Sequence, residues 1–260
     1  MMTLQAINGT RLKTRIDRAG DGAPWVVFSN SLVTDLSVWD GVVTRLSGWN
    51  VLRYDQRGHG GSDVPDGVVD FELLSDDLLA VMDHAGVSRA VCVGLSMGVP
   101  TTLAAYAKAP ERFAGLVFMD GMAKSAPAAV ETWGARIEEG RRLGMLGYAK
   151  VTAERWLTTP DRAEALAAMI AATPFEGFKA CATALQGYDY AAVLPSITVP
   201  ALLVAGLSDG KIPETMCGIA DSIGARFEGV SGAGHVPCFE QPEATARLLS
   251  AFLAEVEAAA

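Results

Sequence analysis

The stretch Gly-Leu-Ser-Met-Gly, residues 94–98, places Ser96 between two glycines directly after the apolar run 90–95. A serine on a tight turn from a buried strand into a helix can present its hydroxyl as a nucleophile, and the flanking glycines let neighbouring backbone pass closely. The same spacing can arise by chance in a chain with 27 glycines, and the serine would then only cap the next helix. Its position at a strand end favours the catalytic interpretation.

A serine hydroxyl needs a base within hydrogen-bond reach, usually a histidine, and the chain has three. His84 lies late in the amphipathic pattern of residues 70–87, which predicts a surface or helix-end position. His59 lies in the glycine-rich turn 55–63, where a structural loop role is favoured. His235 follows the last strand candidate in a loop of small residues. We therefore predict that His235 is the base.

The base needs an orienting carboxylate, and two aspartates qualify. In enzymes built around such a serine turn, the acid stands between the serine and the histidine in chain order, just after a strand. Asp209 follows the buried-strand pattern of residues 201–206, and Asp120 ends the pattern of residues 115–120. We predict Asp209, because Asp120 can equally be a helix-cap or turn carboxylate, and Asp120 remains the alternative.

Acyl transfer also requires donors for the negative charge that develops on the substrate oxygen. The backbone amide of Met97, directly after the serine, is the first predicted donor of this oxyanion hole. The second should come from the loop after an early strand, here within residues 28–40, where Leu32 is the predicted donor.

Alternating strand and helix patterns predict the scaffold that positions these residues. Short runs rich in Val, Ile and Leu alternate with helical patterns, as in a mostly parallel sheet flanked by helices. Asn8-Gly9 predicts a hairpin turn between the first two strands. Helices are predicted over 70–87 and 242–260. The eight predicted strands cover residues 3–7, 11–17, 25–29, 50–54, 90–95, 115–120, 201–206 and 226–230.

Residues 122–194 differ from the rest, because they carry several helix-like segments and no strand candidate. We predict a helical insertion there, and a core domain formed by residues 1–121 and 195–260. Cations of the insertion could contact an anionic substrate, but their spacing also suits a solvated helix face: Arg136, Arg141, Arg142, Lys150 and Arg155. Trp133, Trp156 and Phe175 could line an apolar pocket or simply pack.

Composition narrows the classes of partner. The formal net charge of −9 disfavours nucleic acid and anionic membrane surfaces, so a small molecule is the expected partner. The amino-terminal residues lack a signal-peptide pattern, which predicts a cytoplasmic protein. The cysteines have no zinc-ligand or disulfide spacing, and we expect neither metal nor other cofactor. Only Cys238, three residues after His235, has a position that allows a chemical role. The oligomeric state is left open.

Taken together, four motifs resemble the α/β-hydrolase superfamily: the GxSxG turn, SDGKIP at 208–213, GAGHVPCFEQPE at 232–243 and YDQRGHGGSD at 54–63. The resemblance runs from about residue 25 through the last helix. It implies the α/β-hydrolase fold, with residues 122–194 in the place of the helical lid. Within the superfamily, residues 28–40 and 173–206 are similar to 3-oxoadipate enol-lactonases.

That resemblance implies lactone hydrolysis, in which Ser96 opens the ring to an ester intermediate and His235 activates water to release it. Two departures widen the choice of substrate. Val99-Pro100 follows Gly98, where the family usually has a second glycine. The segment HVPCFE at residues 235–240 is closer to the sequences of general esterases and perhydrolases. The alternatives are therefore a carboxylesterase or perhydrolase, a carbon–carbon bond hydrolase, and a non-catalytic ligand-binding protein of the same fold.

Overall fold

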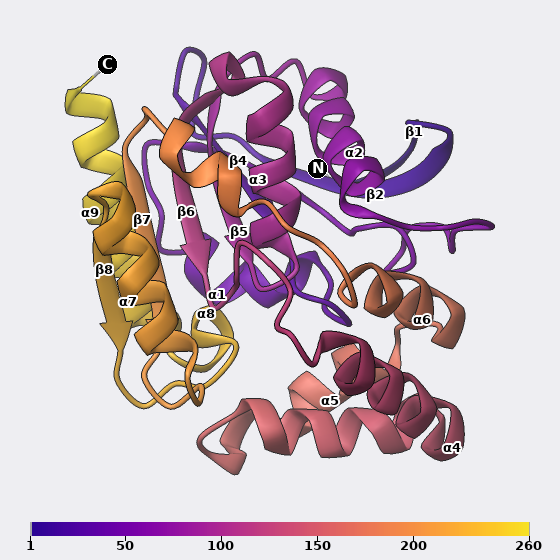
Figure 1. Cartoon of the computed structure of the whole chain (residues 1–260). Coiled ribbons are helices and arrows are strands. Elements are labelled where there is room, and N and C mark those ends of the chain that lie inside the picture. Colours follow the sequence, from indigo (N-terminus) through magenta and orange to yellow (C-terminus); the bar gives the residue numbers. More distant parts are fainter. Residues whose placement is uncertain (1, 260) are drawn as a thin grey trace.

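A computed structural model of the chain describes residues 2–259. Within that range it contains one eight-stranded sheet, with the strands in the order β1-β2-β4-β3-β5-β6-β7-β8 (Figure 1). The first two strands pair antiparallel, β2 pairs antiparallel with β4, and all later pairs are parallel. The strands are β1 (Met2–Ile7), β2 (Thr10–Asp17), β3 (Trp25–Ser29), β4 (Asn50–Tyr54), β5 (Ala90–Leu95), β6 (Phe113–Met119), β7 (Ala201–Gly206) and β8 (Arg226–Val230).

The predicted α/β architecture is confirmed. Five of the eight predicted strands have the observed boundaries, and the other three differ by one or two residues. The largest difference is at β6, which begins at Phe113. Side chains alternate between the two faces of the sheet, as a strand requires. In β5, Val91 and Val93 join one apolar cluster while Cys92 joins the other. A core therefore lies on each face.

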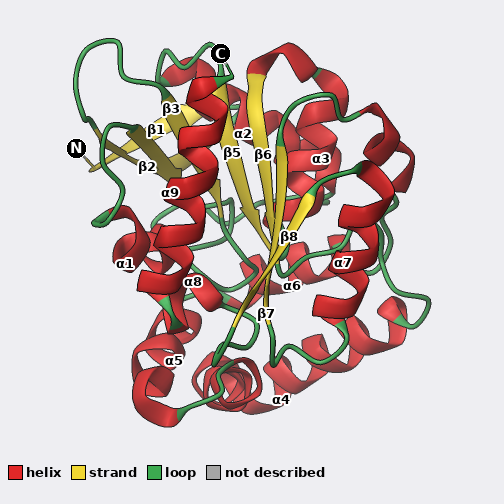
Figure 2. Cartoon of the chain, turned by 90° about the vertical axis from the view of Figure 1, so that its left-hand side faces the viewer, coloured by secondary structure: helices red, strands yellow, loops and turns green. Residues whose placement is uncertain are grey.

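Helices cover both faces of the sheet (Figure 2). One face packs against α1 (Asp40–Val43) and α9 (Pro242–Ala258), and the other against α2 (Phe71–His84), α3 (Gly98–Lys108) and α7 (Ile212–Ile223). The short helix α8 (Pro237–Glu240) leads into α9. Among residues 2–259, none of the helices has the length and apolar character needed to cross a bilayer.

Three helices lie between β6 and β7 in the chain: α4 (Ala129–Trp156), α5 (Ala163–Ala171) and α6 (Phe175–Ala184). Figure 1 shows them beyond the carboxyl ends of the parallel strands. Helix α4 is interrupted at Gly144, whose φ of 67° and ψ of 162° are not helical. That residues 122–194 form a separate lid stays a prediction; here we call them the inserted segment.

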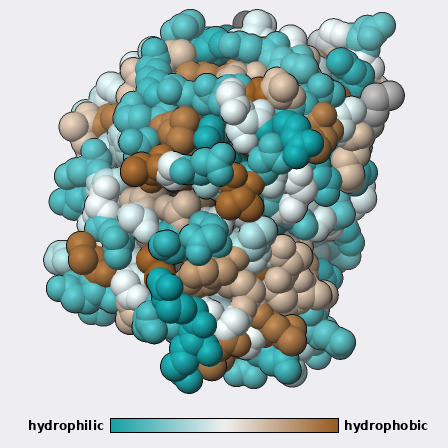
Figure 3. Space-filling view, turned by 90° about the vertical axis from the view of Figure 1, so that its right-hand side faces the viewer, coloured by the Kyte–Doolittle hydropathy of each residue, from teal (hydrophilic) through white to brown (hydrophobic). Residues whose placement is uncertain are grey.

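The outer surface near the inserted segment mixes polar and apolar side chains. Figure 3 shows hydrophobic side chains in separate patches among hydrophilic ones on one face of the molecule. Exposed large apolar residues include Val130 and Leu146 on α4 and Val68 before α2. Scattered exposure of this kind is normal for a globular protein.

The inserted segment contacts the core through the loop 55–63. A Cβ at either Gly58 or Gly177 would collide with the backbone of the other residue, so both positions require glycine. The Cys181 thiol on α6 donates to the Arg57 carbonyl at 3.6 Å. Arg57 in turn makes two 2.6 Å hydrogen bonds to the buried carboxylate of Asp77 on α2. This loop is therefore fixed from both sides.

His59 lies in the same loop and is fully buried. Its Nδ1 is 3.0 Å from the Arg57 carbonyl oxygen, and its Nε2 has no hydrogen-bond partner among the described residues. Burial lowers the pKa of His59 to about 4, because the charged imidazolium would lose its hydration. The folded chain thus keeps this imidazole neutral at pH values where the unfolded chain protonates it.

We predict that His59 makes the protein less stable in mild acid. Between about pH 6.5 and about pH 4 the unfolded chain takes up a proton that the folded chain does not, so the free energy of unfolding falls as pH falls. From pH 7 to pH 5 this residue should contribute a loss of about 2 kcal/mol. Urea denaturation at both pH values should show that His59→Gln loses less stability than the wild type by this amount. Equal losses in the two proteins would contradict the prediction.

Candidate active site

Ser96 occupies the turn between β5 and α3 in a strained conformation. Its φ is 52°, in the left-handed region that residues other than glycine rarely adopt. Its amide donates to the Met119 carbonyl at 2.7 Å, which ties the turn to the end of β6. A Cβ at Gly94 would collide with the Gly98 carbonyl, and one at Gly98 with the Ser29 carbonyl. The two glycines of the motif are therefore required by close backbone approach.

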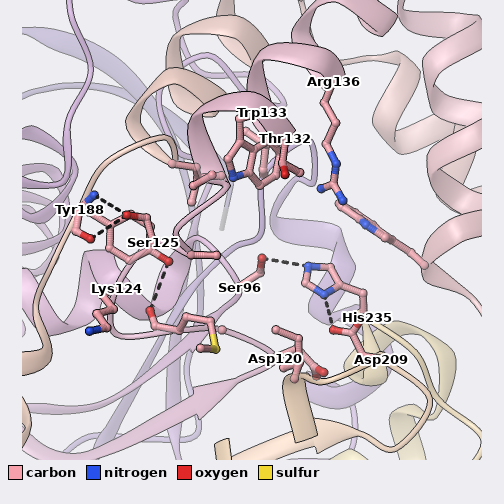
Figure 4. A pocket seen from close by; sticks show the side chains of 18 of the residues that line it. Ser96, Asp120, Lys124, Ser125, Thr132, Trp133, Arg136, Tyr188, Asp209 and His235 are labelled. Carbon is pink, nitrogen blue, oxygen red and sulfur yellow. Dashed lines mark hydrogen bonds and ion pairs between the residues drawn. The ribbon is translucent and has the colours of Figure 1, made fainter. Parts of the chain in front are cut away.

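The structure brings Ser96, His235 and Asp209 together (Figure 4). His235 lies in the loop after β8, with Nε2 2.9 Å from the Ser96 Oγ. Its other ring nitrogen, Nδ1, is 2.7 Å from the Oδ2 of Asp209, in the loop after β7. A backbone bond from the Ser208 amide to the Ala233 carbonyl, at 2.9 Å, joins these two loops. The three predicted residues therefore form one continuous chain of contacts.

This arrangement has the geometry for nucleophilic catalysis. A neutral imidazole that donates through Nδ1 to a carboxylate has Nε2 free to accept the proton of a hydroxyl. All three side chains retain some exposure; His235 is 16 % and Asp209 22 % exposed. The serine hydroxyl can thus be activated where a substrate can reach it.

Asp120, the alternative acid, is close to this chain but does not contact His235 Nδ1 in the manner of Asp209. It is almost fully buried and accepts a hydrogen bond from the Gly206 amide at 3.0 Å. Burial, reinforced by the nearby Asp209 carboxylate, raises the pKa of Asp120 well above its usual range. Ligand atoms of Asp120, Asp209 and His235 lie within 4.8 Å of one another, which would allow a metal ion. Two of these three groups, His235 and Asp209, already have each other as hydrogen-bond partners at 2.7 Å.

The other sequence candidates lie elsewhere. His59 is buried in the loop after β4, and His84 is the exposed last residue of α2. Cys238 is fully buried on α8, and burial raises the pKa of its thiol far above neutral, which disfavours the reactive thiolate. Val99, the departure from the family pattern, is buried, and a Cβ at Gly121 would collide with its side chain.

The two predicted oxyanion donors remain consistent with that role. Leu32 and Met97 are both buried, and Leu32 lines the cavity beside Ser96. In the part of the chain that the structure describes, neither backbone amide donates a hydrogen bond to a protein acceptor. Their assignment as an oxyanion hole stays a prediction.

A cavity of about 340 Å³ opens at Ser96 and His235, between the strand ends and the inserted segment. The aromatic rings of Trp133, Trp156 and Tyr188 contribute to its wall. The Trp156 ring packs against the His235 ring at 4.9 Å between centroids. Cation-bearing side chains also line the cavity: Lys124, Arg136 and Arg155. Of the aromatic candidates from the sequence, Phe175 is not among the lining residues and instead packs near Phe178.

Arg136 differs from the other arginine of the cavity. Arg155 pairs with Glu139 at 3.2 Å, whereas Arg136 has no carboxylate or carbonyl partner within the described residues. Its guanidinium lies over the Trp133 ring, 4.7 Å from the centroid, and Figure 4 shows it extending into the space above His235. Burial lowers the pKa of Arg136, because the charged guanidinium loses hydration, and the carboxylates of Glu139 and Asp209 act in the opposite direction from a distance.

Sequence reasoning missed several residues of the cavity wall. Ser125 and Tyr188 both line it and are linked, because the Tyr188 amide lies 3.2 Å from the Ser125 hydroxyl. They are 63 residues apart and belong to no motif, so their sequence gave no signal. Thr132 also lines the cavity and was missed, although its neighbour Trp133 on α4 was a candidate from the sequence.

Proteins of known family are similar to this chain in sequence and in fold. Residues 24–242 match the family described as alpha/beta hydrolase fold. Over 235 residues, covering 85 % of each chain, the protein is 33 % identical to 3-oxoadipate enol-lactonase 2 of Acinetobacter baylyi. Over 253 residues it is 30 % identical to 3-oxoadipate enol-lactonase 1 of the same organism, covering 91 % of each chain.

Solved structures of an enol-lactonase and an esterase have the same fold as this chain. The enol-lactonase from Burkholderia xenovorans LB400 superposes with a TM-score of 0.90 at 34 % identity, covering 97 % of this chain and all of the other. A thermophilic esterase from Thermogutta terrifontis, solved with malate bound, gives a TM-score of 0.86 at 30 % identity, covering 98 % and 97 %. The chain therefore belongs to the α/β-hydrolase fold family, as a hydrolase of ester bonds that is similar to the 3-oxoadipate enol-lactonases.

Proposed function

We propose that the protein is a serine hydrolase that opens a lactone or short carboxylic ester through an acyl-enzyme intermediate. The observation that carries this proposal is the continuous contact from Ser96 Oγ through His235 to Asp209, at 2.9 and 2.7 Å. A non-catalytic protein of the same fold would have no need to keep all three groups in register beneath a cavity.

In the first half of the proposed reaction, the Ser96 Oγ attacks the ester carbonyl carbon while His235 Nε2 takes the hydroxyl proton. The Asp209 carboxylate accepts from Nδ1 and stabilises the imidazolium that forms. The tetrahedral intermediate then expels the ring oxygen, which receives the proton from Nε2. In a lactone the leaving oxygen stays attached to the acyl group, so the ring opens into an ester of Ser96.

In the second half, His235 Nε2 takes a proton from the water that attacks the acyl carbon. The tetrahedral intermediate then expels the Ser96 oxygen, to which Nε2 returns the proton. Both halves pass through an oxyanion, for which the Met97 and Leu32 amides are the proposed donors. Each such donor typically contributes about 3 kcal/mol of transition-state stabilisation. The strained turn holds the Met97 amide beside the nucleophile without further reorganisation.

For the substrate, we propose a lactone or ester that carries a carboxylate, with 3-oxoadipate enol-lactone as the leading candidate. Two observations support this choice. Arg136 lies in the cavity with no ion-pair partner among residues 2–259, and a half-buried guanidinium is a strong receptor for a carboxylate. The enol-lactonases named above are similar over most of the chain. The wall formed by Trp133 and Trp156 would hold the apolar part of such a molecule.

The proposed roles predict distinct effects for the two aspartates. Ser96→Ala should abolish hydrolysis of a short-chain chromogenic ester and labelling by a serine-directed phosphonate. Asp209→Asn should lower kcat by about 10³- to 10⁴-fold, because the imidazole loses the carboxylate that orients it. Asp120→Asn, the matched control, should stay within about tenfold of the wild type.

Circular dichroism should show all three variants folded. A larger loss in Asp120→Asn than in Asp209→Asn would transfer the role of acid to Asp120. A wild type that neither hydrolyses esters and lactones nor reacts with the phosphonate would overturn the enzymatic proposal.

Arg136 should determine preference for anionic substrates. Arg136→Met keeps an unbranched, flexible side chain but removes the guanidinium and its charge, so kcat/KM for a carboxylate-bearing enol-lactone should fall about 10- to 100-fold. The rate with a neutral aryl ester should change little. Arg141→Gln is the matched control on the same helix, because Arg141 is exposed and pairs with Glu138 at 3.2 Å. Equal losses on charged and neutral substrates would contradict the proposed role.

A further inference from the structure

Glu240, the last residue of α8, is a buried carboxylate that the proposed chemistry does not use. It is 7 % exposed and has no arginine, lysine or histidine partner among the described residues. Its two oxygens instead accept hydrogen bonds from two separate parts of the chain: the loop that carries His235 and the residues that follow α4. A buried charge without a counter-ion is costly unless such donors satisfy it.

On the histidine side, the contact is one residue from the proposed base. The Gly234 amide donates to Glu240 Oε2 at 2.8 Å. The next amide, that of His235, donates to the Trp156 carbonyl at 2.9 Å. A Cβ at Gly234 would collide with that same carbonyl, so the loop lies directly against the end of α4.

On the side of the inserted segment, Glu240 Oε1 receives the other donors. The amides of Thr158 and Thr159 lie 2.6 and 3.2 Å away, and the Thr158 hydroxyl is at 2.5 Å. The same hydroxyl is 3.1 Å from the Gly232 carbonyl in the histidine loop. Trp156, which ends α4, packs its ring on His235. One carboxylate thus joins the end of α4 to the loop that carries the imidazole.

The chemistry of the donors explains why an acid occupies this position. A carboxylate only accepts, so both of its oxygens can face N–H and O–H groups. A glutamine of the same shape has one oxygen and one NH₂ group, and its NH₂ would face either the Gly234 amide or the threonine donors. The isosteric amide must therefore break one of the two connections while it leaves the volume unchanged.

We propose that Glu240 is a positioning residue for His235, which it holds in line with Ser96 and Asp209 by fixing the loop backbone against the end of α4. The proposal rests on the function proposed above. It implies that Glu240 acts on the chemical steps rather than on substrate binding, because Gly234 directly precedes the base in the chain and is not among the residues that line the cavity. Small displacements of a base can cost about 10²-fold in rate.

Glu240→Gln tests this role, with Glu243→Gln as the matched control. Glu243 lies three residues further on, is exposed and pairs with Arg45 at 2.9 Å. Three quantities are measured well below the melting temperature: kcat and KM for a chromogenic aryl ester, the phosphonate labelling rate, and the downfield NMR line of the proton between His235 Nδ1 and Asp209.

Folded Glu240→Gln should lose about 10- to 100-fold in kcat and in labelling rate with KM nearly constant, and its Nδ1 line should broaden or vanish. Glu243→Gln should match the wild type in all three. A purely structural Glu240 would lower the melting temperature but leave kcat per folded molecule and the NMR line unchanged, and that result would overturn the proposal.

If Glu240→Gln does not fold, Thr158→Val decides. It removes only the hydroxyl contacts to Glu240 and Gly232, and we expect a severalfold loss of kcat with a broadened Nδ1 line. Wild-type values for both would overturn the proposal. The NMR line needs no substrate, so it tests Glu240 even if the wild type hydrolyses no ester, which would count against the proposed function alone.

Discussion

The 2.9 Å contact between the Ser96 hydroxyl and the His235 imidazole is the constraint on which the rest of the site depends. The two residues are 139 positions apart, and no local interaction could bring them together. The sheet does so, because β5, β7 and β8 run parallel and end at the same side. Each side chain then needs only a short loop to reach the others.

This placement has a cost in backbone strain at two adjacent strand ends. Ser96 after β5 and Asp120 after β6 both have positive φ, of 52° and 42°. Such conformations typically cost about 1–3 kcal/mol each and persist only where the surroundings enforce them. Here the surroundings are the packed strands and the bonds from the Ser96 amide to Met119 and from the Asp120 amide to Val204. The rigid sheet therefore stabilises a turn that would not form on its own.

Sequence patterns predicted the sheet well, because buried parallel strands are short runs of branched apolar residues bounded by turns. They also placed Ser96, Asp209 and His235 at strand ends, and the structure brings those residues within hydrogen-bond distance, although their roles remain predictions. Contacts between residues far apart in the chain could not be predicted from the sequence. Nothing near Arg136 in the chain reveals that it forms no ion pair with another described residue. Glu240 lies within one of the sequence motifs, but the sequence does not reveal which groups donate to it. One donor, Thr158, is 82 residues away, and another is the backbone amide of a glycine, which has no side chain to signal the contact.

The break at Gly144 divides helix α4 into two parts with different contacts. The part before it lines the cavity with Trp133 and Arg136. The part after it lines the cavity with Arg155 and Trp156, and the Trp156 carbonyl is also hydrogen-bonded to the histidine loop. The helical hydrogen-bond ladder is not continuous across the break. Substitutions at Trp133 or Arg136 can therefore change one part of the cavity wall while the bond between the Trp156 carbonyl and the histidine loop is kept. A helix split in this way is a ready starting point for the divergence of new specificities, by natural selection or by design.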